Sequence, residues 1–350
     1  MATKGRGAGF DPPNRFETLR YEADPDLSSD PDDEPALRTV FLRDPSRSII
    51  ATNQSPDVGF DASINPYRGC EHGCAYCYAR PTHEYLGLSA GLDFETRILV
   101  KERAPELLRE ALSSRQWKPQ VIAISGVTDA YQPIERRLEL TRRCLEVLLE
   151  FRNPVCVVTK NRLVARDADL LAELARRDCA SVSVSVTTLD PALARAMEPR
   201  ASRPELRLEA IARLAEAGVP VGVLVAPIVP GLTDHETPAI LDAARSAGAS
   251  FAGFVVLRLP HAVKEIFAEW LARHHPERRA KVLNRVCAVR GGRLYDARFG
   301  ARQRGKGPFA DQIAQLFESS RRRAGIAARG PALSSAGFRR PTASPQLALF

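Results

Sequence analysis

Apolar and polar positions alternate in two rhythms along the middle of the chain. Short runs rich in β-branched residues predict strands, and longer amphipathic stretches between them predict helices. The expected strands are 96–100, 121–124, 155–159, 181–186, 220–225 and 251–257. The expected helices are 104–114, 137–151, 168–177, segments ending at 218, 237–247 and 262–273. Strands that alternate with helices in this way are typical of parallel β/α units.

The expected strands are nearly all apolar, which indicates a parallel sheet buried on both faces. Six such units are too few to close an eight-stranded barrel. We therefore expect an α/β core over residues 41–290, followed by a C-terminal extension with a basic loop and a helix over 291–324. Residues 1–40 and 325–350 are rich in Gly, Pro, Ser or Ala without apolar periodicity, so both are expected to be mostly disordered.

Composition places the chain among globular proteins, with 44% hydrophobic and 26% charged residues in 350. No run of eighteen apolar residues exists to span a membrane, and the N-terminus lacks the apolar stretch of a signal peptide. We expect a cytoplasmic protein. The net charge of +8 includes a basic C-terminal region, which is typical of a solvated tail. Binding of nucleic acid through phosphate contacts is the less favoured interpretation of that charge.

The strongest chemical signal is the triplet Cys70, Cys74 and Cys77, spaced Cys-x3-Cys-x2-Cys. Three thiolates can ligate three irons of a cubane cluster and leave the fourth iron open to a small molecule. The other four cysteines are scattered singly and are expected to pack as small apolar residues. A structural zinc site is the alternative, but it needs a fourth ligand such as His72 or His83.

This spacing, with Tyr76 before the third cysteine, resembles that of the radical S-adenosylmethionine (SAM) enzymes. The string Thr-Asp-x-Tyr-Gln-Pro-x-Glu at 128–135 resembles the branch of that superfamily that includes spore photoproduct lyase. The resemblance implies an open partial (β/α)6 barrel of parallel strands with the cysteine loop after its first strand. The first core strand is then a short segment near 61–65 instead of 96–100.

The resemblance also implies a [4Fe-4S] cluster on the three cysteines, with SAM chelated to the open iron. One-electron reduction then yields a 5′-deoxyadenosyl radical that abstracts hydrogen from a substrate, which the sequence does not identify. Such an enzyme, a lyase or an oxidoreductase, requires a one-electron donor such as flavodoxin or ferredoxin. In parallel β/α folds the remaining contacts gather at the carboxyl ends of strands.

The expected SAM contacts lie in the cysteine loop and at successive strand ends. They are Tyr76, Tyr78, Ser125, Gly126, Thr128, Asp129, Lys160, Ser183, Ser185 and Ala226. Each also has a structural interpretation. Thr128 and Asp129 are good helix-capping types, Lys160 suits a surface, and the serines suit a polar barrel interior. No catalytic residue is assigned.

Two alternative functions remain open. The first is repair of a DNA photoproduct, but the resemblance places a hydrogen-donating cysteine near the end of the second strand, where this chain has Ala123. The second is a non-enzymatic zinc or iron–sulfur protein that binds nucleic acid. Radical SAM enzymes that modify peptides often carry an added cysteine-rich module, which this sequence lacks.

Overall fold

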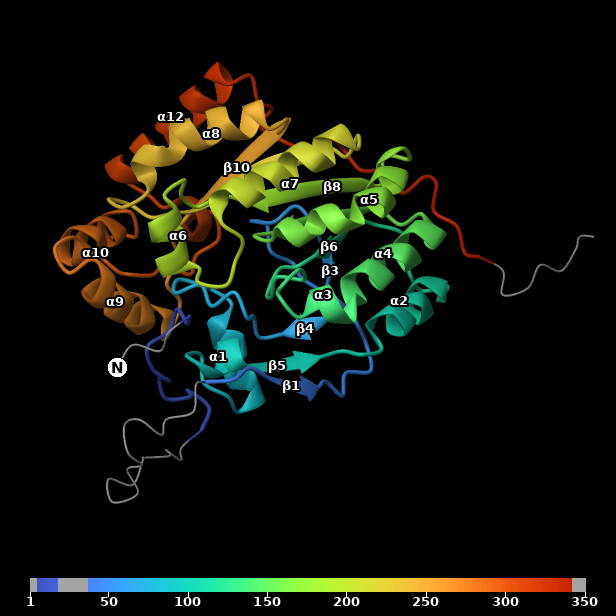
Figure 1. Cartoon of the computed structure of the whole chain (residues 1–350), viewed down its shortest axis with the longest axis horizontal. Coiled ribbons are helices and arrows are strands. Elements are labelled where there is room, and N and C mark those ends of the chain that lie inside the picture. The colour runs from blue at the N-terminus through green and yellow to red at the C-terminus, as the bar shows by residue number, and fades with distance from the viewer. Residues whose placement is uncertain (1–4, 18–36, 342–350) are drawn as a thin grey trace, which may run out of the picture.

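The computed structural model describes residues 5–17 and 37–341 (Figure 1). Within these ranges, the main sheet has seven strands in the order β10-β9-β8-β7-β6-β3-β2. Six of them pair in parallel, and β2 (Ile50–Thr52) pairs antiparallel with β3 at one edge. The parallel strands are β3 (Ala62–Ile64), β6 (Ile122–Ile124), β7 (Val155–Thr159), β8 (Ala180–Ser185), β9 (Val221–Ile228) and β10 (Phe251–Val256). The predicted open partial barrel is confirmed.

One expected strand belongs elsewhere. The run at 96–100 forms β5 (Arg97–Val100), which joins a separate three-stranded sheet with β1 (Val40–Arg43) and β4 (Tyr67–Arg68). Its apolar side chains Ile98 and Val100 pack with Tyr67 in a small cluster of their own. The first core strand is instead β3, the short segment near 61–65. The cysteine loop therefore follows the first core strand and precedes the second.

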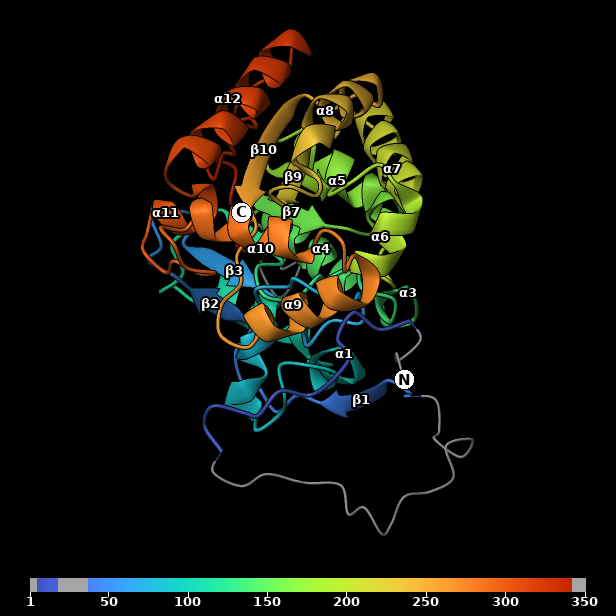
Figure 2. The ribbon, with the colours of Figure 1, turned by 90° about the vertical axis from the view of Figure 1, so that its left-hand side faces the viewer.

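Helices cover the outer face of the main sheet, and neighbours in the series α2, α4, α5, α7, α8 and α12 pack on one another (Figures 1 and 2). Figure 2 shows α12 beside α8, with α9 and α10 in front of the barrel. The α-helices are α1 (Asp93–Thr96), α2 (Ala104–Ser113), α3 (Glu135–Leu138), α4 (Leu140–Phe151), α5 (Ala168–Ala175), α6 (Pro191–Met197), α7 (Pro204–Glu216), α8 (Thr237–Ser246), α9 (Val263–His274), α10 (Arg279–Ala288), α11 (Ala301–Arg304) and α12 (Pro308–Arg323). Among the described helices, none has both the length and the apolar character needed to cross a bilayer.

The two faces of the sheet differ, because successive side chains of a strand point to opposite sides. Outward residues such as Val155 and Val157 are buried in one large core with the helices. Inward residues such as Cys156 and Ser183 are only half-buried. Cys156 lies in register with Ala123 and with Ser181 on the neighbouring strands. The inner face thus carries small or polar side chains such as Cys156 and Ser183 beside apolar ones such as Leu224.

The segment 325–341, expected to be disordered, instead crosses the amino ends of several core strands. Ala327 bridges to Phe251 at the start of β10, and the Ser334 amide donates to Asp178 O at 2.8 Å just before β8. Phe338 packs against Phe151, with ring centroids 6.2 Å apart, before β7. In Figure 1 this segment is red. It lies at the opposite end of the barrel from the carboxyl ends of the strands. Residues 342–350 lie outside the described residues.

Phe338→Ala tests this packing. We expect the free energy of unfolding to fall by about 2 kcal/mol, because a half-buried aromatic ring against the core is lost. Urea unfolding of the full chain measures the change. Phe299→Ala is the control, since that ring is 58% exposed and its loss leaves stability nearly unchanged. Equal stability of both variants and the parent would contradict the docked position of the segment.

Candidate functional site

The three cysteines lie in one loop between β4 and the short helix η3 (Arg80–Thr82). All three are free thiols; Cys70 and Cys74 are buried, and Cys77 packs against the side-chain clusters that contain the other two. The loop bends through Gly73 at φ +65°, a conformation that favours glycine. Burial raises the pKa of Cys70 and Cys74, and the charges of neighbouring loop thiols add to this effect. Three free thiols therefore lie within one short loop.

Side chains after β6 hold this loop in place. The amide of Glu71 donates to Gln132 Oε1 at 2.9 Å, and Gln132 Nε2 donates to Gly69 O at 3.3 Å. In return the Ile134 amide donates to Glu71 Oε2 at 2.7 Å. The string at 128–135 is therefore the part of the barrel on which the cysteine loop rests.

Asp129 joins the loop to two strand ends. Its carboxylate accepts from Thr159 Oγ1 at 2.7 Å and from the Lys160 amide at 2.7 Å, and it lies 3.5 Å from His72 Nδ1. Burial lowers the pKa of His72, which keeps its ring neutral, and Asn161 Nδ2 lies 3.2 Å from its Nε2. Both oxygens of Asp129 thus have partners in the protein. A contact of Asp129 with SAM stays a prediction.

The two histidines near the loop differ in their free nitrogens. His72 has partners at both ring nitrogens. His83 Nε2 lies 2.9 Å from Arg97 O, and its Nδ1 is buried without a hydrogen-bond partner among the described residues. Within the described ranges, no three His, Cys, Asp or Glu side chains converge closely enough to hold a single metal ion. A structural zinc ion normally takes four converging ligands, so these side chains do not form a zinc site.

A buried charge pair lies behind Tyr76. The Glu198 carboxylate pairs with Arg207 and accepts from Tyr76 Oη and from Thr187 Oγ1. Burial alone would raise the pKa of Glu198, but the charges of Arg207 and Lys160 lower it to about 2. The Lys160 ammonium lies 5.9 Å from the centre of the Tyr76 ring. Lys160 and Tyr76, both expected at the SAM site, are brought together.

Other expected contacts line the mouth of the barrel after β6. Tyr78, beside Cys77, donates from its hydroxyl to Gly126 O. Ser125 Oγ accepts from the Ala130 amide at 3.3 Å. Thr128 Oγ1 is buried and has no hydrogen-bond partner among the described residues. A buried hydroxyl without a partner is costly, so a bound ligand is a natural acceptor or donor for it.

The remaining three expected residues lie on β8 and β9. Ser183 is half-buried on the inner face of the barrel, in register with Gly222. Ser185 is buried, and its carbonyl accepts from Arg207 Nη1 at 3.0 Å. The Ala226 carbonyl already accepts from Thr187 Oγ1 at 3.3 Å. Of these three, Ser183 has the most open surroundings.

Sequence reasoning missed an N-terminal strap, residues 5–9, that lies against the cysteine loop. The Gly7 and Ala8 amides donate to the Glu95 carboxylate at 3.1 and 2.9 Å. Glu95 also pairs with buried Arg80, whose Nε donates to Cys74 O at 3.0 Å. A Cβ at position 7 would overlap Gly73 O, so only glycine fits there. The run Gly-Arg-Gly-Ala-Gly at 5–9 is the available signal, but the same composition also predicts disorder.

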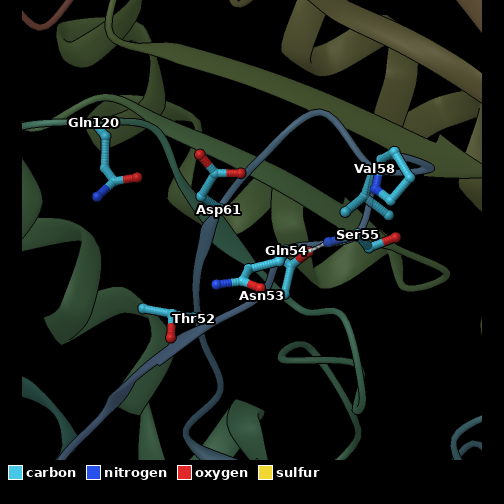
Figure 3. A pocket seen from close by; sticks show the side chains of 8 residues that line it. Thr52, Asn53, Gln54, Ser55, Val58, Asp61 and Gln120 are labelled. Atoms are coloured by element: carbon cyan, nitrogen blue, oxygen red, sulfur yellow. Dashed lines mark hydrogen bonds between the residues drawn. The ribbon is translucent and has the colours of Figure 1, made fainter.

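A separate polar cavity of about 570 Å³ lies at the other end of the strands (Figure 3). It is lined by residues of the β2–β3 loop and by Gln120, with Asn53 Oδ1 accepting from the Ser55 amide at 2.9 Å. Asp61 and Gln120 precede β3 and β6, which places the cavity at the amino ends of these strands. It is not part of the cysteine site.

Comparison with known proteins agrees with this geometry. Residues 64–244 match the Radical SAM superfamily. The chain belongs to the radical SAM superfamily. An uncharacterized protein of Mycobacterium tuberculosis is 38% identical over 232 residues, covering 65% of this chain and 68% of the relative. An uncharacterized protein of Methanocaldococcus jannaschii is 31% identical over 173 residues, covering 49% and 62%.

Among solved structures, this radical SAM chain resembles spore photoproduct lyase with bound AdoMet and dinucleoside spore photoproduct. The TM-score is 0.52 at 17% identity, over 83% of this chain and 81% of that one. At this identity the likeness concerns the fold. Radical SAM enzymes use a [4Fe-4S] cluster and SAM, and a loop with three free thiols suits such a cluster.

Gly7→Ala tests the strap. The added methyl group forces the strap away from Gly73 O, so we expect the free energy of unfolding to fall by about 1–3 kcal/mol. The cluster-loaded protein should also lose iron faster in air, because the loop is less well covered. Gly59→Ala is the control, since its Cβ meets nothing within 4 Å. Iron content over time and urea unfolding are the measurements; parent-like values for both would refute the strap.

Glu198 predicts a pH dependence of stability. Its pKa is lowered from 4.5 to about 2, so its stabilising contribution is complete above pH 4.5 and is lost as pH falls towards 2. The loss is on the order of 3 kcal/mol. In Glu198→Gln this pH dependence should disappear, and stability at pH 7 should fall by about 3–5 kcal/mol because Arg207 stays buried without its partner.

Urea unfolding of the cluster-free chain between pH 6 and pH 3 measures both effects. Asp242→Asn is the control, because its pair with Arg323 is exposed and contributes little. An unchanged pH profile in Glu198→Gln would show that Glu198 is not the titrating group.

Proposed function

We propose that this protein is a radical SAM enzyme that abstracts a hydrogen atom from its substrate. The observation that supports this most is the braced loop with three free thiols, facing the carboxyl ends of six parallel strands among the described residues. Cys70, Cys74 and Cys77 are the proposed ligands of a [4Fe-4S] cluster. Three cysteine ligands would leave one iron of the cluster for SAM.

When bound, the reduced cluster and SAM supply an electron and a 5′-deoxyadenosyl radical. The chain's own groups position and shield them. The Lys160 ammonium offers a point charge for the SAM carboxylate, and the hydroxyls of Thr128 and Ser183 offer hydrogen bonds. Burial and the Glu198 carboxylate raise the pKa of Tyr76, so its hydroxyl stays protonated.

The electron must come from outside the chain. We propose a small one-electron carrier, a flavodoxin or a ferredoxin, as the physiological donor.

Photoproduct repair is not proposed. It is supported by fold likeness alone. Ala123 occupies the position at which the resemblance expects a hydrogen-donating cysteine, and Cys144 is fully buried in the outer core, away from the inner face.

The direct test is cleavage of SAM to 5′-deoxyadenosine by anaerobically reconstituted protein with dithionite. Cys74→Ala should lower the rate by more than about 100-fold, because loss of a direct ligand exceeds the effect of losing a neighbour of a ligand. Cys287→Ala, a half-buried cysteine outside the loop, is the matched control and should keep the parent rate and iron content. Parent-like cleavage by the Cys70/Cys74/Cys77 triple alanine variant would disprove the assignment.

A further inference from the structure

We propose that Arg258 binds an anionic group of the substrate, a phosphate or a carboxylate, at the mouth of the barrel. This inference rests on the proposed function and names the chemistry of the substrate. Arg258 follows β10 by two residues, at the carboxyl end of the last core strand. Chemistry in parallel β/α folds gathers at this end.

The Arg258 guanidinium has no acidic partner. Among the described residues, it forms no ion pair, and its Nε is buried without a hydrogen-bond partner. Its central carbon lies 4.3 Å from the centre of the Tyr78 ring. Tyr78 follows the cluster ligand Cys77 and donates to Gly126 O, so the cation lies within the site. A buried donor without an acceptor is costly, and a ligand oxygen would remove that cost.

Nearby arginines are already used by the fold. Buried Arg290 donates to Val256 O at 2.8 Å and to Leu257 O at 2.7 Å, the carbonyls just before Arg258. These bonds fix the backbone at the end of β10 and therefore the position from which the Arg258 side chain extends. The charge of Arg258 adds to burial in lowering the pKa of Arg290 to about 10. Two cations this close favour an anion between or beside them.

A carboxylate whose charge reaches Arg258 is already paired within the protein. Asp57, whose charge interacts with Arg258, pairs with Arg302 and accepts from the Gly300 amide at 2.7 Å. Its side chain is only 7% exposed. Asp57 therefore satisfies Arg302, and the positive charge of Arg258 remains for a ligand.

The geometry selects the kind of ligand. The Tyr78 ring covers one face of the guanidinium, which leaves the N–H groups at its edge for a partner. A planar guanidinium binds the two oxygens of a carboxylate or phosphate side by side. In the proposed function a different cation, Lys160, pairs with the carboxylate of SAM. Lys160 follows β7 and interacts with Cys74. In the sheet, β8 and β9 separate β7 from β10.

The test is calorimetric titration of the cluster-loaded full chain with inorganic phosphate and with succinate. Wild type should bind at least one of the two, and Arg258→Gln should bind it about tenfold or more weakly. Arg258→Lys should give an intermediate loss, because the charge is kept and the paired donors are lost. Arg322→Gln is the matched control, an exposed arginine on α12 whose loss should not change the affinity.

Each outcome of this titration supports or overturns the Arg258 site. Preference for phosphate or for succinate supports the proposal and identifies the anionic group. Equal affinity of wild type and both Arg258 variants, or no binding to wild type, overturns it. Displacement of the anion by saturating SAM also overturns it, because Arg258 would then serve the cofactor.

Failure of the proposed function has a separate readout. Wild type that cleaves SAM but binds neither anion refutes the Arg258 site alone. Wild type that binds an anion through Arg258 but does not cleave SAM refutes the proposed function alone. Unfolding midpoints of the variants check that each is folded.

Discussion

The buried carboxylate of Glu95 connects three parts of the chain that are far apart in sequence. It accepts from the strap at Gly7 and Ala8, and it pairs with Arg80, which in turn holds the carbonyl of Cys74. A buried pair of this kind adds little net stability, but removing one partner leaves an uncompensated charge at a cost of about 3–5 kcal/mol. Loss of either Glu95 or Arg80 alone would therefore destabilise the position of the cysteine loop.

This arrangement explains why the loop has a defined shape without belonging to a long helix or strand. On one side it is bound by the strap and Arg80, and on the other by Gln132 and Asp129. Two sets of side chains, from the N-terminal region and from the β6 loop, therefore hold the loop between them. Thiols fixed in this way are prepared for a ligand before it binds, which reduces the ordering cost of binding.

Much of the fold could be predicted from the sequence, because apolar runs such as 155–159 and 220–225 are long and rich in β-branched residues. The first core strand is harder to predict, since β3 has only three residues and one of them is Ser63. The longer apolar run of β5 has the pattern of a core strand but forms its own small cluster. The strap is held by backbone amides and one distant carboxylate, and such contacts leave no periodic pattern in a sequence.

The loop that carries the candidate metal ligands could be found from the sequence, because the spacing of its three cysteines is specific. The other residues of the candidate site are harder to predict, because the residue types that contact a ligand also form hydrogen bonds within loops. Asp129 illustrates this, since both its oxygens are used within the protein. Arg258 carries no sequence signal, because a lone arginine after a strand has no distinctive pattern; the Tyr78 ring and the missing acidic partner among the described residues reveal it.

The segment 325–341 has a mechanical consequence. It runs from the start of β10 past β8 to the chain before β6, where Arg340 reaches the carbonyls of Ser114 and Trp117. The last and the early units of the barrel are therefore joined at the amino ends of their strands. Because this link lies at the amino ends of the strands, it leaves their carboxyl ends, where the cysteine loop rests, uncovered by the segment.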